Sequence, residues 1–266
     1  MSISKKPQRP SVMDELAEEI GRTQVVLIAG GLGKRLGQPD RPKCLVEING
    51  KTLIERAIEY FRANGFTEYV VLVGYLGEQV ERLLGDGSGL GVHVRYSYDP
   101  GEPGKVGKAK ALKHAILNGA VDGSRRSIIA FPDDVFLDST LPTRLLLTHM
   151  EYTRSRGTIA TVVLASGYRL PFGVARVNGE GLVESFEEKP VLSYYVNTGI
   201  YVMDPPAYRF VLDNVDMSLG GPIELETAVL PKIASMGLLA AFAIPASSWI
   251  PINTLKDLEE AASRIR

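Results

Sequence analysis

The chain has 266 residues, of which 45% are hydrophobic and 23% are charged. This composition excludes disordered and collagen-like chains, and the length suffices for one large domain with a substantial core. Thirty Lys and Arg residues stand against 31 Asp and Glu residues, so the net charge of -1 gives no reason to expect a nucleic acid or an anionic membrane as partner. A single cysteine, no secretory-type N-terminus and no apolar run near the roughly 20 residues of a bilayer span predict a cytoplasmic protein.

The first 23 residues are predicted to form a polar tail and one helix, apart from a body that comprises residues 24–266. Apolar side chains recur at helical spacing in this segment, at Met13, Leu16, Ala17 and Ile20. The helix either covers the body or pairs with a second copy in a homo-oligomer, and the sequence supports both alternatives.

The body begins with a predicted β-α-β unit. An apolar run from Gln24 to Ala29 stops at a glycine-rich stretch, as a buried parallel strand does when it enters a loop. A helix follows from Thr52 to the Asn64-Gly65 pair, and the next strand begins at Tyr69. The intervening Asn49-Gly50 pair predicts a tight turn.

The alternation of strands and helices continues along the chain. It predicts helices at 77–84, 107–118 and 142–154 and strands at 92–98, 127–131 and 159–164, then short antiparallel strands at 173–177, 182–186 and 196–203. Helices at 206–212 and 224–235, a strand at 239–244 and a last helix from Leu255 complete the pattern. It indicates a three-layer α/β/α sandwich with a mixed, mostly parallel, Rossmann-like sheet, whose ligand is expected at the carboxyl ends of the strands.

The strongest chemical signal is the loop Ala29-Gly-Gly-Leu-Gly-Lys-Arg-Leu-Gly, followed by Arg41-Pro-Lys-Cys-Leu. Glycines let backbone N–H groups approach a phosphate or a nucleobase, and the basic side chains bring positive charge to the same place. Its spacing matches neither the dinucleotide fingerprint nor a P-loop. An isolated motif of this kind equally fits a flexible turn with solvated basic residues.

The loop resembles the signature of the sugar-phosphate nucleotidylyltransferases, and further segments resemble that family in the same order. They are Gly107-Lys-Ala-Lys-Ala-Leu, Phe131-Pro-Asp-Asp-Val, Phe172-Gly-Val-Ala-Arg-Val, Phe186-Glu-Glu-Lys-Pro and Asn197-Thr-Gly-Ile-Tyr. The resemblance covers residues 24–264 and implies the family's nucleotidyltransferase fold and its Mg²⁺-dependent reaction. In that reaction a sugar 1-phosphate and a nucleoside triphosphate form a nucleotide sugar and pyrophosphate. UTP with glucose 1-phosphate ranks first; GTP with mannose 1-phosphate and dTTP with glucose 1-phosphate are the alternatives.

The same resemblance implies roles for individual residues. The nucleotide is held by Gly30, Gly31, Gly33 and Gly107. Arg35 draws on the β- and γ-phosphates, Lys43 stabilises the charge that develops at the α-phosphate, and Asp133 binds Mg²⁺. Lys189 meets the sugar's phosphate, and the sugar hydroxyls meet Gly173, Glu188, Asn197 and Gly199. Taken singly, Glu188 and Lys189 also fit a solvated surface, and the glycines fit ordinary turns.

One segment departs from the family pattern. The family has Trp-x-Asp-x-Gly-Thr near its end, with the Asp as a second metal ligand, whereas this chain has Trp249-Ile-Pro-Ile-Asn-Thr and so Pro251 at the acidic position. The departure leaves a second hypothesis open, a catalytically weak regulatory subunit that binds a nucleotide or a nucleotide sugar. A glycosyltransferase is a third, but Asp133 and Asp134 are adjacent instead of forming the Asp-x-Asp motif of those enzymes. Lys108, which stands where the family has a small hydroxyl residue, is predicted to offset a weakened metal site by its charge.

Overall fold

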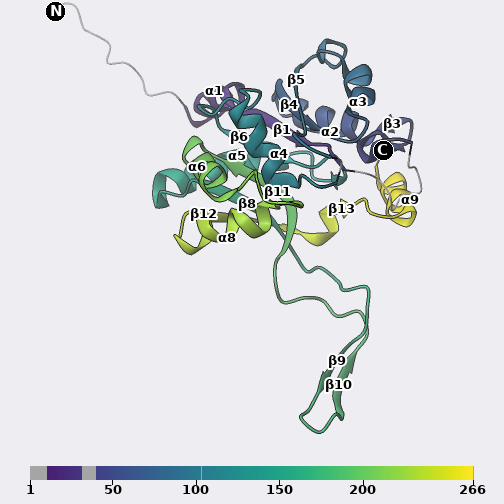
Figure 1. Ribbon diagram of the computed structural model, residues 1–266. Coiled ribbons are helices and arrows are strands. Elements are labelled where there is room, and N and C mark those ends of the chain that lie inside the picture. Colours follow the sequence, from purple (N-terminus) through teal and green to yellow (C-terminus); the bar gives the residue numbers. More distant parts are fainter. Residues whose placement is uncertain (1–10, 32–39, 103, 266) are drawn as a thin grey trace, which may run out of the picture.

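A seven-stranded sheet forms the centre of the protein (Figure 1). The computed structural model describes residues 11–31, 40–102 and 104–265. The strand order is β12-β8-β11-β6-β1-β4-β5; β11 runs antiparallel to both neighbours, and the other six strands run parallel to one another. This mixed, mostly parallel sheet confirms the predicted fold class. The strands are β1 (Gln24–Ile28), β4 (Glu68–Val73), β5 (His93–Tyr98), β6 (Ser127–Ala130), β8 (Ala160–Ser166), β11 (Val196–Met203) and β12 (Leu239–Pro245).

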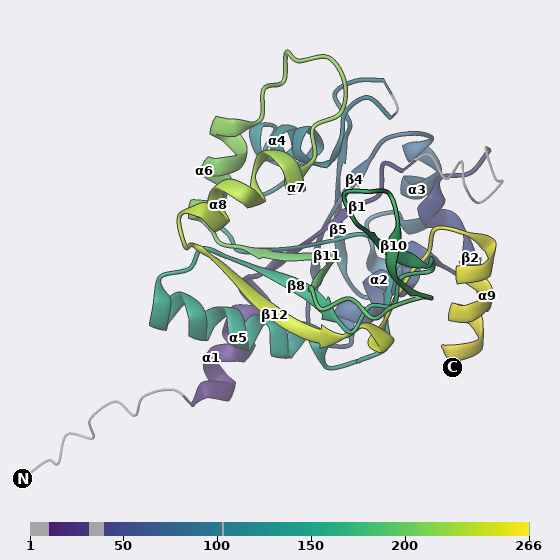
Figure 2. The same ribbon diagram turned by 90° about the horizontal axis from the view of Figure 1, so that it is seen from below.

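Helices cover both faces of the sheet because its strands are apolar on both sides. On β1, Val25 and Leu27 belong to the core under one face, while Val26 belongs to the core under the other. Figure 2 shows α1 and α5 on one side of the sheet and α4, α6 and α8 on the other. The helices of the first side are α1 (Val12–Arg22), α2 (Leu53–Arg62), α3 (Gly77–Leu84) and α5 (Leu141–Arg156). Those of the second side are α4 (Lys108–Leu117), α6 (Pro205–Asn214), α7 (Leu225–Ala228) and α8 (Leu230–Ser235).

A third, smaller core joins the C-terminal helix to one short hairpin and to an antiparallel pair of short strands that lie far apart in the sequence. It contains Ile48, Leu53, Ile250 and Ala261, all buried. The elements are β2 (Glu47–Ile48), β3 (Lys51–Thr52), β7 (Asp134–Phe136), β13 (Trp249–Pro251) and α9 (Leu255–Arg264), and short 3-10 helices stand at η2 (Lys43–Leu45), η3 (Ser88–Leu90) and η4 (Ala246–Ser248). None of the helices within the described ranges combines the length and the apolar character that a membrane span requires.

Of two local predictions from the sequence, the tight turn at Asn49-Gly50 is confirmed and the single helix at 224–235 is not. Asn49 and Gly50 have φ values of 48° and 75°, which is the pair of positive angles that the predicted tight turn between β2 and β3 requires. The single helix predicted at 224–235 is wrong, because the chain forms α7 and α8 with a break at Val229. Pro231, at the start of α8, has no N–H to continue the hydrogen bonding of a longer helix, and its ring excludes the preceding turn.

The segment 167–195, here called the arm, leaves the sheet after β8 and returns at β11 (Figure 1). It carries the hairpin of β9 (Val174–Val177) and β10 (Val183–Glu187), which stands clear of the body. Backbone hydrogen bonds close its root, from Leu170 to Pro190 and from Leu192 to Tyr168, at 2.9 and 2.8 Å. The three short antiparallel strands predicted from the sequence therefore differ in their pairing. The strand at 196–203 lies within the main sheet, whereas β9 and β10 pair only with each other.

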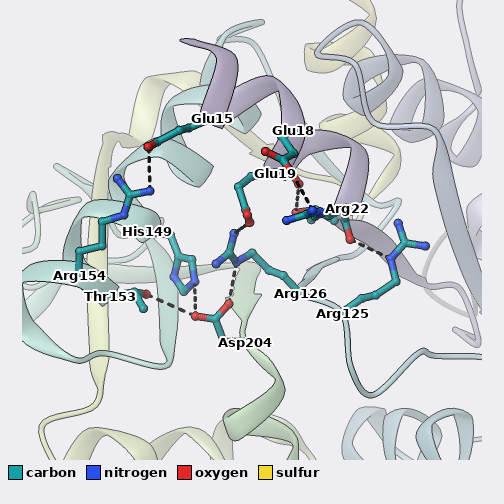
Figure 3. A network of polar contacts seen from close by, with 11 residues as sticks. Glu15, Glu18, Glu19, Arg22, Arg125, Arg126, His149, Thr153, Arg154 and Asp204 are labelled. Carbon is teal, nitrogen blue, oxygen red and sulfur yellow. Dashed lines mark hydrogen bonds and ion pairs between the residues drawn. The ribbon is translucent and has the colours of Figure 1, made fainter. Parts of the chain in front are cut away.

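The N-terminal helix packs on the body through one buried side chain and a network of charges (Figure 3). Leu16 is 3% exposed, and the guanidinium of Arg126 lies 2.5 Å from Glu19 of α1 and 2.7 Å from Asp204. Burial alone would raise the pKa of Asp204, but the hydrogen bond from His149 and the charge of Arg126 hold it below its ordinary value. The helix thus covers the body in this single chain, and its pairing with a second copy stays a prediction.

Candidate active site

A pocket of about 330 Å³ opens at the carboxyl ends of the parallel strands, where the sequence predicts a ligand. Gly30 and Gly31 line it directly after β1, Asp99 directly after β5, and Asp133 after β6. The start of α4 closes the opposite wall with Gly107 and Lys108. Three segments that the sequence singles out, far apart along the chain, thus meet in one cavity because parallel strands end at the same edge of the sheet.

Lys43 and Asp133, which both line this pocket, form an ion pair. Their side chains are 17% and 31% exposed, so the pair is shielded but open to a ligand from one side. The Lys43 ammonium also donates to Oδ1 of Asn253 at 3.4 Å. A lysine held between a carboxylate and an amide has a fixed position, and a pre-positioned cation stabilises charge that develops on a phosphate.

The residue next to this carboxylate has a different environment. Asp134 accepts a hydrogen bond of 2.8 Å from the indole of Trp249, and burial together with the charge of Asp133 raises its pKa well above the ordinary value. Strand β13 pairs with β7 so that Pro251 lies opposite Asp134. The segment that departs from the family pattern is therefore packed against the acidic pair, with a proline ring where the family has a carboxylate.

Of the predicted nucleotide-binding glycines, Gly107 is sterically required, and Gly30 lies close to the side chain of Asp99. A Cβ atom on Gly107 would lie 2.5 Å from the backbone of Ile223, and its φ is +76°. A Cβ on Gly30 would lie 2.8 Å from Oδ2 of Asp99, whereas one on Gly31 would approach no closer than 3.9 Å, to Lys43. The space beside Gly31 in the pocket is therefore open, whereas the carboxylate of Asp99 occupies the space beside Gly30. The other two residues predicted in this loop, Gly33 and Arg35, lie outside the described residues.

Lys108 reaches the pocket wall from the first turn of α4. Its ammonium is paired with the carboxylate of Glu226, lies 3.8 Å from Glu224, and sits 4.7 Å from the centre of the Phe131 ring. Cation–π contact and two carboxylates hold this charge beside the segment that carries Asp133. The basic residue that the sequence places at the helix start is therefore part of the site and not a solvated surface charge.

Asn197 and Gly199 lie on β11, behind this wall. Asn197 donates to the hydroxyl of Tyr201 at 2.7 Å, and Tyr201 donates to Glu226 at 3.0 Å. A Cβ on Gly199 would lie 2.7 Å from the ring of Phe131, so only glycine fits at this position. A continuous chain of polar contacts therefore links Asn197 to Lys108 and to the pocket.

The remaining predicted residues are on the arm and do not line the pocket. Gly173 lies beside Glu188, since a Cβ on Gly173 would be 2.8 Å from the Glu188 carboxylate. Lys189 has a φ of 49°, and its carbonyl accepts from Arg169 at 3.1 Å. The structure thus brings Lys43, Asp133, Gly30, Gly31 and Gly107 together in the pocket and leaves Gly173, Glu188 and Lys189 on a separate segment.

Three residues of the site escape the sequence analysis: Asp99, which lines the pocket, and Glu226 and Asn253, which contact the pocket lysines Lys108 and Lys43. Asn253 falls in the segment already singled out, two residues after Pro251, and its polar side chain was the available signal. Glu226 lies within the helix predicted at 224–235 and has no motif around it. Asp99 ends a predicted strand, and parallel strands that end in polar residues are the general signal for a site at that edge.

The chain belongs to the nucleotidyl transferase family, whose model matches residues 24–266. It is 28% identical over 256 residues to the UTP–glucose-1-phosphate uridylyltransferase of Synechocystis sp., covering 90% of this chain and 62% of the relative. It is also 28% identical over 242 residues to the mannose-1-phosphate guanylyltransferase catalytic subunit beta of Drosophila pseudoobscura pseudoobscura, covering 88% and 60%. The chain therefore spans about 60% of the length of these relatives.

The solved structure of HddC from Yersinia pseudotuberculosis has the same fold. The two chains superpose with a TM-score of 0.66 at 21% sequence identity, covering 91% of this chain and 99% of that one.

Proposed function

We propose that the protein is a sugar-1-phosphate nucleotidyltransferase that forms a nucleotide sugar and pyrophosphate from a nucleoside triphosphate and a sugar 1-phosphate. The observation that carries the proposal is the contact between Lys43 and Asp133 in a pocket that glycines also line. Family membership and relatives named for this reaction support it. The single Cys44, which cannot form an internal disulfide, supports a cytoplasmic setting.

The reaction requires that two polyanions approach each other. A phosphate oxygen of the sugar 1-phosphate attacks the α-phosphorus in line, and pyrophosphate leaves. Lys43 is proposed to stabilise the negative charge that develops at the α-phosphate, and Lys108 adds a second cation to the same pocket. Arg35 is proposed to draw on the β- and γ-phosphates. The glycines at the ends of β1 and at the start of α4 let the nucleotide lie close to the backbone.

The oxygen donors beside Lys43 fit a magnesium ion. Within the described ranges, no group of three or more His, Cys, Asp or Glu side chains is arranged to hold a metal. Asp133 offers a carboxylate and Asn253 an amide oxygen, and Mg²⁺ is commonly held by one or two protein ligands together with phosphates and water. The ion would supply charge neutralisation on the triphosphate. Asp133 and Asn253 are the residues that would hold the ion, and Lys43, which contacts both, would be the protein cation beside it.

The sugar site is proposed to combine Asn197 and Gly199 of β11 with Gly173, Glu188 and Lys189 of the arm. Among substrate pairs, the sequence resemblance favours UTP with glucose 1-phosphate over GTP with mannose 1-phosphate and dTTP with glucose 1-phosphate. The regulatory alternative rests on Pro251, which occupies the position of a second metal ligand and packs directly against the acidic pair.

Pyrophosphate release separates the two functions. The full chain is incubated with a matrix of nucleoside triphosphates and sugar 1-phosphates, with and without Mg²⁺, beside Asp133→Ala. Asp122→Ala is the matched control, because Asp122 precedes β6 at the opposite edge of the sheet. Magnesium-dependent release with one preferred pair, lost only in Asp133→Ala, supports the enzyme; binding of nucleotides without release by any pair supports the regulatory subunit.

A further inference from the structure

Glu226 is a carboxylate of the site to which the proposed chemistry gives no role. It belongs to α7, and its Oε1 atom accepts from the hydroxyl of Tyr201 at 3.0 Å and pairs with the ammonium of Lys108. The second oxygen, Oε2, is buried and has no hydrogen-bond partner within the described part of the chain. Burial of an acceptor without a donor costs free energy. Proteins retain such costs chiefly at functional sites.

The hydrogen bonds around Glu226 can run in one direction only. A carboxylate that is paired with a lysine accepts hydrogen bonds and does not donate them, so the single hydrogen of the Tyr201 hydroxyl points to Glu226. The hydroxyl oxygen is then left with acceptor capacity alone. Asn197 lies 2.7 Å from this oxygen, and the only part of its amide that donates is the NH2 group. Glu226 therefore determines which end of the Asn197 amide faces Tyr201.

A backbone contact holds the other end of the same amide. Oδ1 of Asn197 accepts from the N–H of Gly199 at 3.1 Å, which requires the same orientation of the amide as the contact with Tyr201. The NH2 group still has a second hydrogen, and Oδ1 still has a second lone pair. Because Asn197 is exposed, both are accessible to a ligand.

The contacts from Asn197 through Tyr201 to Glu226, here called the relay, are held rigidly. Tyr201 is fully buried, and its ring packs edge to face on Phe131 with centroids 6.4 Å apart. Burial, and after it the charge of Glu226, raise the pKa of Tyr201, so the hydroxyl keeps its hydrogen. The ammonium of Lys108 lies 4.7 Å from the centre of the same Phe131 ring. A buried network of this kind specifies a single arrangement of its members.

We propose that Glu226 is a positioning residue for the sugar 1-phosphate, because through Tyr201 it holds the Asn197 amide in the orientation that binds a sugar hydroxyl; the inference rests on the proposed function. A sugar hydroxyl both donates and accepts, so an amide with a fixed donor and a fixed acceptor binds it better than an amide that turns freely. Among the described residues, Glu224 lines the pocket and Glu226 does not. Glu226 thus acts on the sugar through two hydrogen bonds and not by contact.

The test is the KM for the sugar 1-phosphate in steady-state pyrophosphate release by the full chain, with nucleoside triphosphate and Mg²⁺ at saturation. Tyr201→Phe keeps the ring and removes the hydroxyl of the relay, and we expect it to raise this KM about tenfold, which is the order of one lost hydrogen bond. Glu226→Ala should raise it to a similar extent. Glu226→Gln keeps an oxygen that accepts from Tyr201, so its KM should stay within about threefold of the wild type.

A double variant and substrate analogues distinguish positioning from a general loss of structure. Because the relay acts as one unit, Glu226→Ala combined with Tyr201→Phe should raise the KM about tenfold, and not by the roughly hundredfold of two independent sites. Monodeoxy analogues of the preferred sugar 1-phosphate give the second readout. The wild type should discriminate about tenfold against the analogue that lacks the hydroxyl bound by Asn197, and Tyr201→Phe should discriminate less than about threefold.

Two variants control the measurement. Tyr208→Phe removes the hydroxyl of another buried tyrosine, which lies 2.5 Å from the hydroxyl of Ser127 and donates to the carbonyl of Arg125 at 2.9 Å, at the opposite edge of the sheet. It should leave both the KM and the discrimination unchanged. Glu224→Gln removes the second carboxylate near Lys108, 3.8 Å away, and should keep the discrimination among the analogues.

The outcomes separate this inference from the proposed function. An unchanged KM in Glu226→Ala or in Tyr201→Phe, a roughly hundredfold rise in the double variant, or undiminished discrimination in Tyr201→Phe overturns the role of Glu226 and leaves the nucleotidyltransferase standing. If Glu226→Ala does not fold, Tyr201→Phe and Glu226→Gln decide the matter. If the wild type releases no pyrophosphate with any substrate pair, both the inference and the proposed function fail.

Discussion

The body and the arm both contain β-strands, but the strands of the body are buried and those of the arm are exposed. In the body, β6 has all four residues buried, and its neighbours β1 and β11 bury both faces against helices. In the arm, all four residues of β9 and all five of β10 are exposed. Packing therefore fixes the side chains of the body. In the arm, backbone pairing fixes the register of the hairpin, but its side chains do not pack on the body.

This difference divides the predicted site in two. Lys43, Asp133 and Gly107 belong to the body, and each has a partner or a steric constraint that determines its position. Glu188 and Lys189 belong to the arm and lie clear of the pocket. Within the hairpin, Ala175 pairs with Phe186 and Val177 with Val183, so one face is apolar and the opposite face carries Arg176 and Ser185 as its cross-strand pair. Such a ribbon gains its stability from what it packs against, since an isolated hairpin is marginal in water.

The largest difference between the two regions is expected in stability. Ile129→Ala, in the middle of β6, removes a side chain that is fully buried, and we expect it to lower the free energy of unfolding by about 2–5 kcal/mol. Val183→Ala on the arm removes a side chain that is 62% exposed and should change it by less than about 0.5 kcal/mol. Urea unfolding followed by circular dichroism measures both. A loss above 1 kcal/mol for Val183→Ala would show that the arm packs on the body or on a second copy in solution.

The next contrast is in activity. Lys43→Met should lower kcat by about 10²–10³ with little change in stability, as expected when one pre-positioned donor to a transition state is lost. Lys189→Met is the matched variant on the arm. It should lower kcat or raise KM to a similar extent only if the arm closes over the pocket during turnover. Steady-state pyrophosphate release measures both. An unchanged kcat in Lys43→Met would remove this lysine from the catalytic machinery.

The sequence predicts the body well because its signals are local. Apolar runs that stop at Gly30 or at Pro132 mark buried parallel strands, and such strands place their carboxyl ends at one edge. It does not predict that Asp99 fills the space beside Gly30, because that contact joins residues whose distance depends on the strand order. It also does not predict that the arm stands clear of the body. The family resemblance implies a role for Glu188 and Lys189, but it does not imply which contacts hold these two residues. The break at Val229 was missed because the apolar spacing of α7 and α8 continues across it.

A smaller effect is expected at the second cation of the body. Lys108→Ala should lower the rate about tenfold and raise the magnesium concentration needed for half-maximal rate, because the charge beside Phe131 and Asp133 would be lost. Lys105→Ala is the control from the same basic run, since Lys105 is exposed and paired with Glu102. Magnesium titrations of the initial rate compare the two. If Lys108→Ala changes neither the rate nor the magnesium requirement, Lys108 does not compensate for Pro251.

The smallest effect concerns the pH dependence of stability, in which Asp99 of the body should differ from Glu187 of the arm. Burial raises the pKa of Asp99 from 3.8 to about 6, so between these values the folded protein keeps a proton that the unfolded chain has lost. Its contribution to stability is therefore complete below about pH 4 and is lost as the pH rises through 6. Asp99→Asn cannot ionise and should melt about 2–4 °C above the wild type at pH 8, which corresponds to about 1 kcal/mol after allowance for partial exposure, and the gap should close toward pH 4. Glu187→Gln, on an exposed strand, should leave the melting curve unchanged at both pH values; a gap for Asp99→Asn that persists at pH 4 would assign its effect to packing instead of ionisation.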